Sequence, residues 1–349
     1  MFRRLARGTL IFDWSHAQPG AALLCLPALA LPLAVGLLTD HVRQGMMMAA
    51  GAFSVGFGSF QELRGSRHRP MLVAAIGMCV SSWIGTLAGL SSAAAVALVG
   101  IWGGAYGLAW TIGPAASWIA LQCLVWLVIS SAYPIGGLRL LTRGSFVLGG
   151  GLLQMLIIST VWRVRGRMSP VMGGGARAAE PALAAPGSGR RARAWQALRA
   201  AAVLALGTGA ARWLWLPSGY WVPMTAAIVM RPALTQTIER GLARALGTLA
   251  GAAIATLIAF ALRPLPVLLS VLVLIFAGAA FLLVYVNYAA FAACLTSYVV
   301  FLLALAGAAE ATVVVHRILN TLIGAGLAFA GHLVFARLER WWGGFQHDG

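Results

Sequence analysis

The chain has 349 residues, of which 60% are hydrophobic and 9% are charged, with a mean hydropathy of +0.87. An ordinary soluble domain carries about 25% charged residues, so this composition excludes that class. The net charge is +17, and every basic residue is an arginine. Without a lysine, the chain has no Walker A phosphate loop and no lysine Schiff base.

Long apolar runs dominate the sequence, and a membrane-spanning helix needs about 20 such residues. We therefore predict an all-α fold, a polytopic transmembrane helical bundle with two related halves of about six spans each. The predicted spans of the first half are 21–38, 45–60, 71–90, 93–112, 114–136 and 145–162. Those of the second half are 200–217, 219–230, 243–262, 265–283, 285–306 and 312–335.

The two halves share an order of features. A span, a charged stretch and a second span at 45–90 match those at 219–262, and Arg139 before a glycine-rich run matches Arg317. The pentapeptide GTLAG occurs at 85–89 and at 247–251, at different depths in its span, and we attribute this copy to chance. An even number of spans per half predicts a parallel duplication with both ends in the cytoplasm.

Composition changes sharply between the halves. The segment 163–199 holds eight arginines, one acid and many Gly, Ala, Pro and Ser residues. We predict a basic, flexible, cytoplasmic linker here that separates a first transmembrane half (1–162) from a second (200–349). Nucleic acid is not an expected partner, because aromatic residues do not alternate with these arginines. Anionic lipid at the bilayer surface is the expected neighbour.

The stretch after residue 230 looks amphipathic. Arg231 and Pro232 end one apolar run, since proline breaks the hydrogen-bonding pattern of a helix. Gln236, Arg240 and Arg244 then recur on one helical face, with leucines on the other. We predict a short helix that lies on the membrane surface and then turns into the next span.

This region also resembles a known family. The residues that carry the resemblance are Tyr220-Trp221-Val222-Pro223, Thr225 to Val229, Arg231-Pro232, Thr237, Arg240, Arg244 and Gly247-Thr248. Their order is similar to the signature of the fusaric acid resistance (FUSC) family, which includes aromatic acid exporters of bacterial inner membranes. The resemblance implies a multi-pass protein of the bacterial inner membrane that exports small organic, aromatic acid-like compounds. The chain lacks the large soluble domain that separates the halves of longer exporters.

Charged and polar residues near span ends are the candidate substrate-binding residues, because charge inside hydrocarbon is costly. Arg231, Glu239 and Arg240 belong to the family signature, with anchoring of the surface helix as the alternative role. Arg139 and Arg317 occupy matching places, with interfacial snorkelling as the alternative. Tyr285, Asn287 and Tyr288 interrupt an apolar run, either along a substrate path or at a simple helix break.

Catalytic and metal-binding patterns are not found in the sequence. No paired-carboxylate, GxSxG or HExxH motif occurs, and neither the six histidines nor the four cysteines have ligand spacing. We therefore expect no enzyme activity, no cofactor and no metal. The expected function is efflux of a small organic anion, and the alternatives are a non-transporting membrane scaffold subunit or a passive channel. A homo-oligomer and a periplasmic adaptor are the protein partners that the sequence leaves open.

Overall fold

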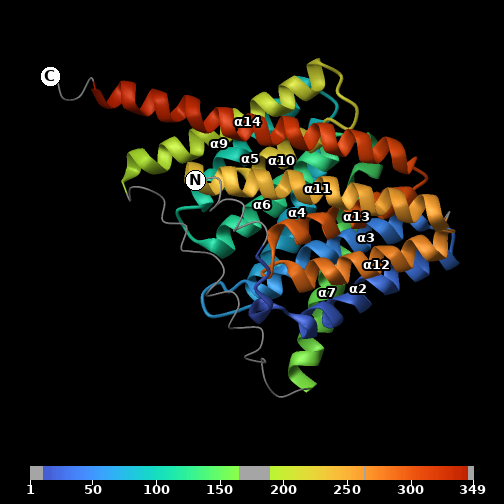
Figure 1. The fold of residues 1–349 in the computed structure, drawn as a ribbon. Coiled ribbons are helices and arrows are strands. Elements are labelled where there is room, and N and C mark those ends of the chain that lie inside the picture. The colour runs from blue at the N-terminus through green and yellow to red at the C-terminus, as the bar shows by residue number, and fades with distance from the viewer. Residues whose placement is uncertain (1–10, 165–188, 263–264, 345–349) are drawn as a thin grey trace.

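The computed structural model describes residues 11–164, 189–262 and 265–344 (Figure 1). Across these residues the chain forms twelve α-helices and no strand. The first half comprises α2 (Pro19–Leu38), α3 (Val42–Gly56), α4 (His68–Ala88), α5 (Ser92–Ala109), α6 (Pro114–Ser131) and α7 (Leu140–Val164). The second comprises α9 (Arg190–Trp213), α10 (Trp221–Val229), α11 (Leu234–Leu262), α12 (Pro266–Leu283), α13 (Tyr288–Leu305) and α14 (Glu310–Gly344).

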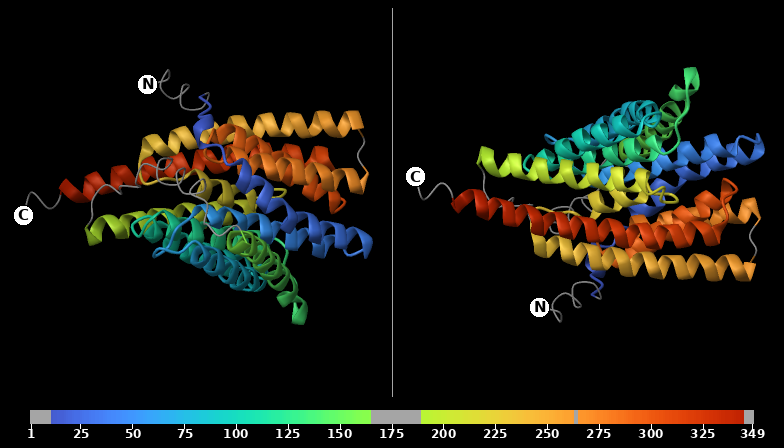
Figure 2. Two further views of the ribbon diagram at one scale, coloured as in Figure 1. Left: turned by 90° about the horizontal axis from the view of Figure 1, so that it is seen from below. Right: turned by 90° about the horizontal axis from the view of Figure 1, so that it is seen from above.

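Most of these helices lie side by side along one common direction (Figures 1 and 2). Within the described ranges, nine are long and apolar enough to cross a membrane. Their outward faces are apolar, as shown by Phe260, which is 82% exposed, and by the exposed side chains of Leu23 and Ile275. A surface of this kind suits lipid rather than water. The predicted all-α, polytopic bundle is confirmed.

The two halves repeat the same helix packing. In the first half α3 and α4 pack on α7, and α4 packs on α6. In the second half α10 and α11 pack on α14, and α11 packs on α13. One constant shift in numbering aligns both ends of α5 with α12 and both ends of α6 with α13. The six-helix units are therefore equivalent in order and in contacts.

The first helix of each half packs against the other half. The α2 helix packs on α12, and α9 packs on α5. The α5–α9 contact is especially close, because Gly103 and Gly107 of α5 lie against the backbone of α9, where a larger residue would separate the helices. The halves are thus joined by an exchange of helices, in addition to the contacts between their inner faces.

Both copies of GTLAG lie in the same helix pair of the repeat, but at different depths. A Cβ atom at Gly85 of α4 or at Gly89, its C-cap, would clash with the backbone oxygen of Leu127 or Ser131 in α6. In the second half, Gly247 and Gly251 of α11 meet the backbone oxygens of Ala289 and Ala293 in α13. The first copy thus contacts the C-terminal end of α6 and the second the N-terminal end of α13. Because the copies do not correspond in the register of the repeat, the attribution of the repeated pentapeptide to chance stays a prediction.

Three expectations about the helices need correction. The stretch 234–241 does not form a separate surface helix, because α11 is continuous from Leu234 to Leu262. The predicted span 219–230 contains only the nine-residue α10, which ends before a non-helical segment at Met230–Ala233. The helical chain resumes at Arg190, so the last ten residues of the predicted linker are helical. Residues 165–188 of that linker lie outside the described ranges.

Candidate functional site

A cavity of about 1230 Å³ lies between the two halves. Its walls come mainly from α3 and α6 of the first half and from α10 and α13 of the second. Because α3 is equivalent to α10, and α6 to α13, corresponding helices face one another across the cavity. Sites at the interface of two structural repeats are typical of membrane transporters.

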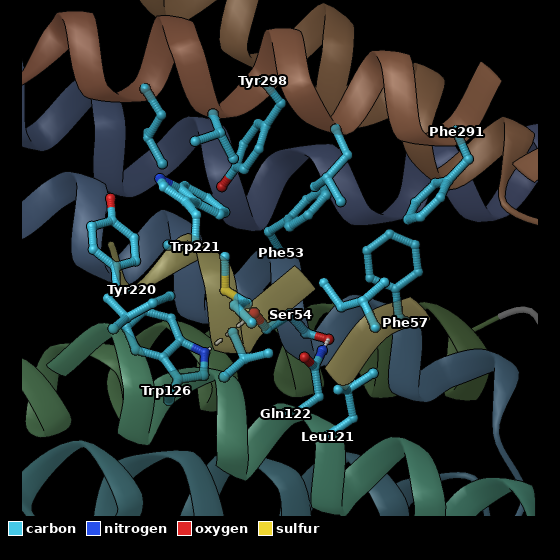
Figure 3. Close-up of a pocket in the computed structure, with 18 of the residues that line it drawn as sticks. Phe53, Ser54, Phe57, Leu121, Gln122, Trp126, Tyr220, Trp221, Phe291 and Tyr298 are labelled. Carbon is cyan, nitrogen blue, oxygen red and sulfur yellow. Dashed lines mark hydrogen bonds between the residues drawn. The ribbon is translucent and has the colours of Figure 1, made fainter. Parts of the chain in front are cut away.

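Aromatic side chains form much of the cavity wall (Figure 3). The ring of Phe53 stacks on that of Tyr298 with 4.3 Å between centroids. Figure 3 shows the hydroxyl end of Tyr298 directed into the cavity. On the α6 side, the indole of Trp126 donates to the Ser54 hydroxyl at 3.4 Å, which fixes one wall. These surfaces provide flat apolar contacts for a ring.

Charge in the cavity is of one sign. Among the described residues that line it there is no aspartate or glutamate, whereas six arginines line it: Arg43, Arg143, Arg231, Arg240, Arg244 and Arg317. A guanidinium removed from water is costly unless a partner compensates its charge. The cavity therefore has a strong electrostatic preference for anions.

Arg317 of α14 is the most informative of these residues. Its side chain is 1% exposed, and its guanidinium carbon lies 4.0 Å from the ring centroid of Trp221. Nη2 donates a long hydrogen bond of 3.4 Å to the hydroxyl of Thr296. The Nε and Nη1 groups have no hydrogen-bond partner within the described part of the chain. Buried donors of this kind normally have partners.

A second group of charges surrounds Tyr288 at the start of α13. Arg240 lies over the Tyr288 ring, 4.2 Å from its centroid. The Tyr288 hydroxyl is close enough to Arg240, Arg244 and Arg231 to interact with each charge. Arg244 is 1% exposed, and its Nε and Nη1 groups find no acceptor in the described ranges. These arginines are positioned because α11 places residues 240 and 244 one turn apart on its inner face.

The segment between α10 and α11 is held by two side chains. The hydroxyl of Thr237 accepts from the backbone N–H of Arg231 at 3.0 Å. Arg199 of α9 donates through Nη2 to the backbone oxygen of Arg231 at 2.8 Å and through Nη1 to His332 at 2.9 Å. These bonds satisfy backbone groups of the non-helical segment between α10 and α11. They also fix where the Arg231 side chain enters the cavity.

Arg143 of α7 is the first-half counterpart of Arg317. The numbering shift that aligns α5 with α12 also aligns these two arginines. The sequence pairing of Arg317 with Arg139 was therefore out of register by one turn, because the order of features alone does not fix a register. Arg143 is 8% exposed, and it donates to the backbone oxygens of Ser130 and Tyr133, each at 3.1 Å. Its charge is engaged by the protein itself.

An aromatic pair joins the halves at one end of the cavity. The hydroxyl of Tyr133, after α6, donates to the hydroxyl of Tyr220, before α10, at 3.4 Å. Both residues also line a second cavity of about 590 Å³ that contains Arg212. The Tyr133–Tyr220 pair thus lies between the two cavities.

The structure brings most of the predicted site residues together. Arg231, Arg240, Arg317, Tyr285, Asn287 and Tyr288 all line the large cavity. Asn287 also caps α13, because its Oδ1 accepts from the Ala290 N–H at 2.9 Å. Arg139 and Glu239 are exposed and do not line the cavity. A role of these two residues in binding stays a prediction.

Three cavity arginines were not among the predicted site residues, namely Arg43, Arg143 and Arg244. Arg143 lies in the same sequence region as Arg139, and only the register of the repeat distinguishes them. Arg244 was placed in the family signature but was interpreted as part of a surface face. Its spacing from Arg240 was the available signal, because two arginines one turn apart in an otherwise apolar helix must face the protein interior.

Comparison with known families agrees with this location. Residues 201–331 match a family model described as fusaric acid resistance protein-like. No curated protein and no solved structure matched the chain. The matched range includes four of the six cavity arginines, namely Arg231, Arg240, Arg244 and Arg317. Residues 201–331 of this multi-pass membrane protein are therefore similar to the fusaric acid resistance protein-like family, as the sequence signature indicated.

Proposed function

We propose that the protein is a transporter of the bacterial inner membrane that exports small organic anions, with aromatic carboxylates as the principal class. One observation carries this proposal, namely a cavity at the interface of the two halves that is lined by six arginines and, among the described residues, by no carboxylate. Arginine binds a carboxylate through two parallel N–H groups, and aromatic side chains pack on a ring.

The size and position of the cavity support the same function. Small-molecule sites commonly have volumes of about 300–1000 Å³, so a cavity of about 1230 Å³ holds a single-ring acid together with water. Its arginines extend from Arg231, which follows α10, to Arg143, which lies in the first turn of α7. An anion that moves along this cavity would remain near a guanidinium.

Transport can be measured with purified protein in liposomes loaded with radiolabelled benzoate. We expect benzoate to leave these liposomes faster than protein-free liposomes and Arg244→Gln to slow its exit. Arg337→Gln is the matched control, because Arg337 is an exposed residue of α14 that does not line the cavity. Accumulation of the labelled acid in intact expressing cells tests the direction.

The liposome result has a clear contradictory outcome. The protein is first shown to be folded by gel filtration and is then placed in liposomes. If benzoate leaves these liposomes no faster than protein-free liposomes, this class of anion is not transported. A slower exit with both Arg244→Gln and Arg337→Gln would show that total charge matters rather than the cavity.

A further inference from the structure

Two guanidinium groups in the cavity have positive charge without compensation. Arg244 and Arg317 are each 1% exposed and each have unpartnered Nε and Nη1 groups. They come from different helices of the second half, α11 and α14. Arg244 is close enough to Arg317 for the two charges to repel each other. One monocarboxylate would leave one of these buried charges unbalanced.

We propose that Arg244 and Arg317 form a binding site for a small organic dianion, in which each guanidinium holds one carboxylate of a dicarboxylate. The planar fork of arginine matches one carboxylate, so two forks are best satisfied by two carboxylates rather than by one that they share. Binding at this site can be measured without transport, although the role of the dicarboxylate as a substrate rests on the function proposed above.

A further donor lies beside Arg244. The hydroxyls of Tyr288 and Tyr298 are buried, line the same cavity and have no hydrogen-bond partner among the described residues. Tyr288 lies near Arg244, so its hydroxyl can donate to a carboxylate that this guanidinium holds. Two guanidinium groups and a hydroxyl indicate recognition of several acceptor oxygens.

The first half serves as an internal comparison. Arg143 is equivalent in register to Arg317, yet Arg143 donates to two backbone oxygens and to the hydroxyl of Thr86. Only one buried arginine of this repeated pair therefore retains unused donors. This asymmetry locates the dianion site in the second half of the chain.

Calorimetric titration of the purified, detergent-solubilised protein tests this site directly. The ligands are benzoate, the three benzenedicarboxylates, inorganic phosphate and neutral benzamide. We expect at least one dicarboxylate to bind about tenfold or more tightly than benzoate, because the second carboxylate adds a charged hydrogen-bonded contact; tenfold corresponds to about 1.4 kcal/mol. Benzamide is expected to bind most weakly.

Variants assign the preference to its residues. Arg244→Gln and Arg317→Gln should each abolish the preference for the dicarboxylate, whereas Arg337→Gln should retain it. Arg317→Lys and Arg244→Lys keep the positive charge, and they replace the glutamine variants in this test if those variants do not fold. Each is expected to recover part of the preference.

Several results would overturn the inference. The first is that the wild type binds benzoate and all dicarboxylates with equal affinity. The second is that the folded Arg244 and Arg317 variants keep the preference for the dicarboxylate. The third is that phosphate binds as tightly as the dicarboxylate. Transport of benzoate without a dicarboxylate preference would leave the proposed function intact and remove this site. Tight dicarboxylate binding without any transport through the liposome membrane would support this site and contradict the proposed function.

Discussion

The hydroxyl of Tyr133 donates to the hydroxyl of Tyr220 across the boundary between the two halves. Each tyrosine is linked to an arginine. On one side, the guanidinium carbon of Arg143 lies 5.6 Å from the centroid of the Tyr133 ring. On the other side, Tyr220 packs against Trp221, and the guanidinium of Arg317 lies over the Trp221 ring. A chain of five contacting side chains thus connects the two equivalent arginines of the repeat. Its two tyrosines line both the large and the small cavity.

Removal of the Tyr133–Tyr220 hydrogen bond should make passage between the two cavities easier. A hydrogen bond of this kind contributes about 1 kcal/mol, which corresponds to about a fivefold change in rate. We therefore expect Tyr133→Phe and Tyr220→Phe each to speed benzoate exit from liposomes by up to about that factor. Because both variants remove the same bond, the double variant should add nothing further. Additive effects, or no effect of either change, would contradict a closing role.

Arg240→Gln should slow export while the amount of protein in the membrane stays normal. Arg240 lies over the Tyr288 ring in the cavity wall, whereas Glu239 is exposed, and within the described ranges no ion pair joins them. Glu239→Gln should therefore have a smaller effect than Arg240→Gln or Arg231→Gln, since exposed charges contribute only about 0–1 kcal/mol. Export rate divided by membrane abundance is the measurement. Normal export in all three variants would leave this stretch with a structural role only.

Gly251→Ala should destabilise the protein, because the new methyl group would meet the backbone oxygen of Ala293. Overpacking of this kind costs about 1–3 kcal/mol. Gly326→Ala is the matched control, since Gly326 is also helical but has open space around its Cβ position. It should be neutral or stabilising by up to about 1 kcal/mol, because alanine favours the helix. Melting curves in detergent compare the two, and equal shifts would contradict the close contact of α11 with α13.

Arg199→Gln should destabilise the segment between α10 and α11. The change removes the donor to the backbone oxygen of Arg231 and the contact with His332. Loss of a buried, charged hydrogen-bond donor costs about 1.5–3 kcal/mol. Arg193→Gln on the exposed face of α9 should change stability by less than about 0.5 kcal/mol. Protease sensitivity around Pro232 reports local opening, and an unchanged digestion pattern in Arg199→Gln would contradict this role.

The spans were predictable because long apolar runs separated by charges leave few alternatives in a chain of this hydropathy. The orientation of α11 was not predictable by the same reasoning. A polar face normally indicates water, but Arg240 and Arg244 face the cavity, while Leu242 and Leu246 are exposed on the outside of the bundle. In a bilayer the apolar face points outward, so a surface helix and a pore-lining helix have the same pattern.

The cavity residues were partly predictable for a related reason. The family signature located Arg231 and Arg240 because their positions carry the resemblance. Arg143 could not be identified from order alone, since Arg139 and Arg143 are one helical turn apart and only the packing of α7 distinguishes an exposed arginine from a buried one. Two of the partners of Arg143 are backbone oxygens, which leave no trace in side-chain patterns.

The packing of α2 on α12 and of α9 on α5 also bears on how the chain is made. Ribosomal synthesis proceeds from the N-terminus, so α2 enters the membrane long before α12 exists. The surface of α2 that contacts α12 must face lipid during this interval, and its apolar composition permits this. The packing of the first half is therefore complete only after the second half has been synthesised. In a nascent chain that stops before residue 266, α2 would lack α12, one of its native neighbours.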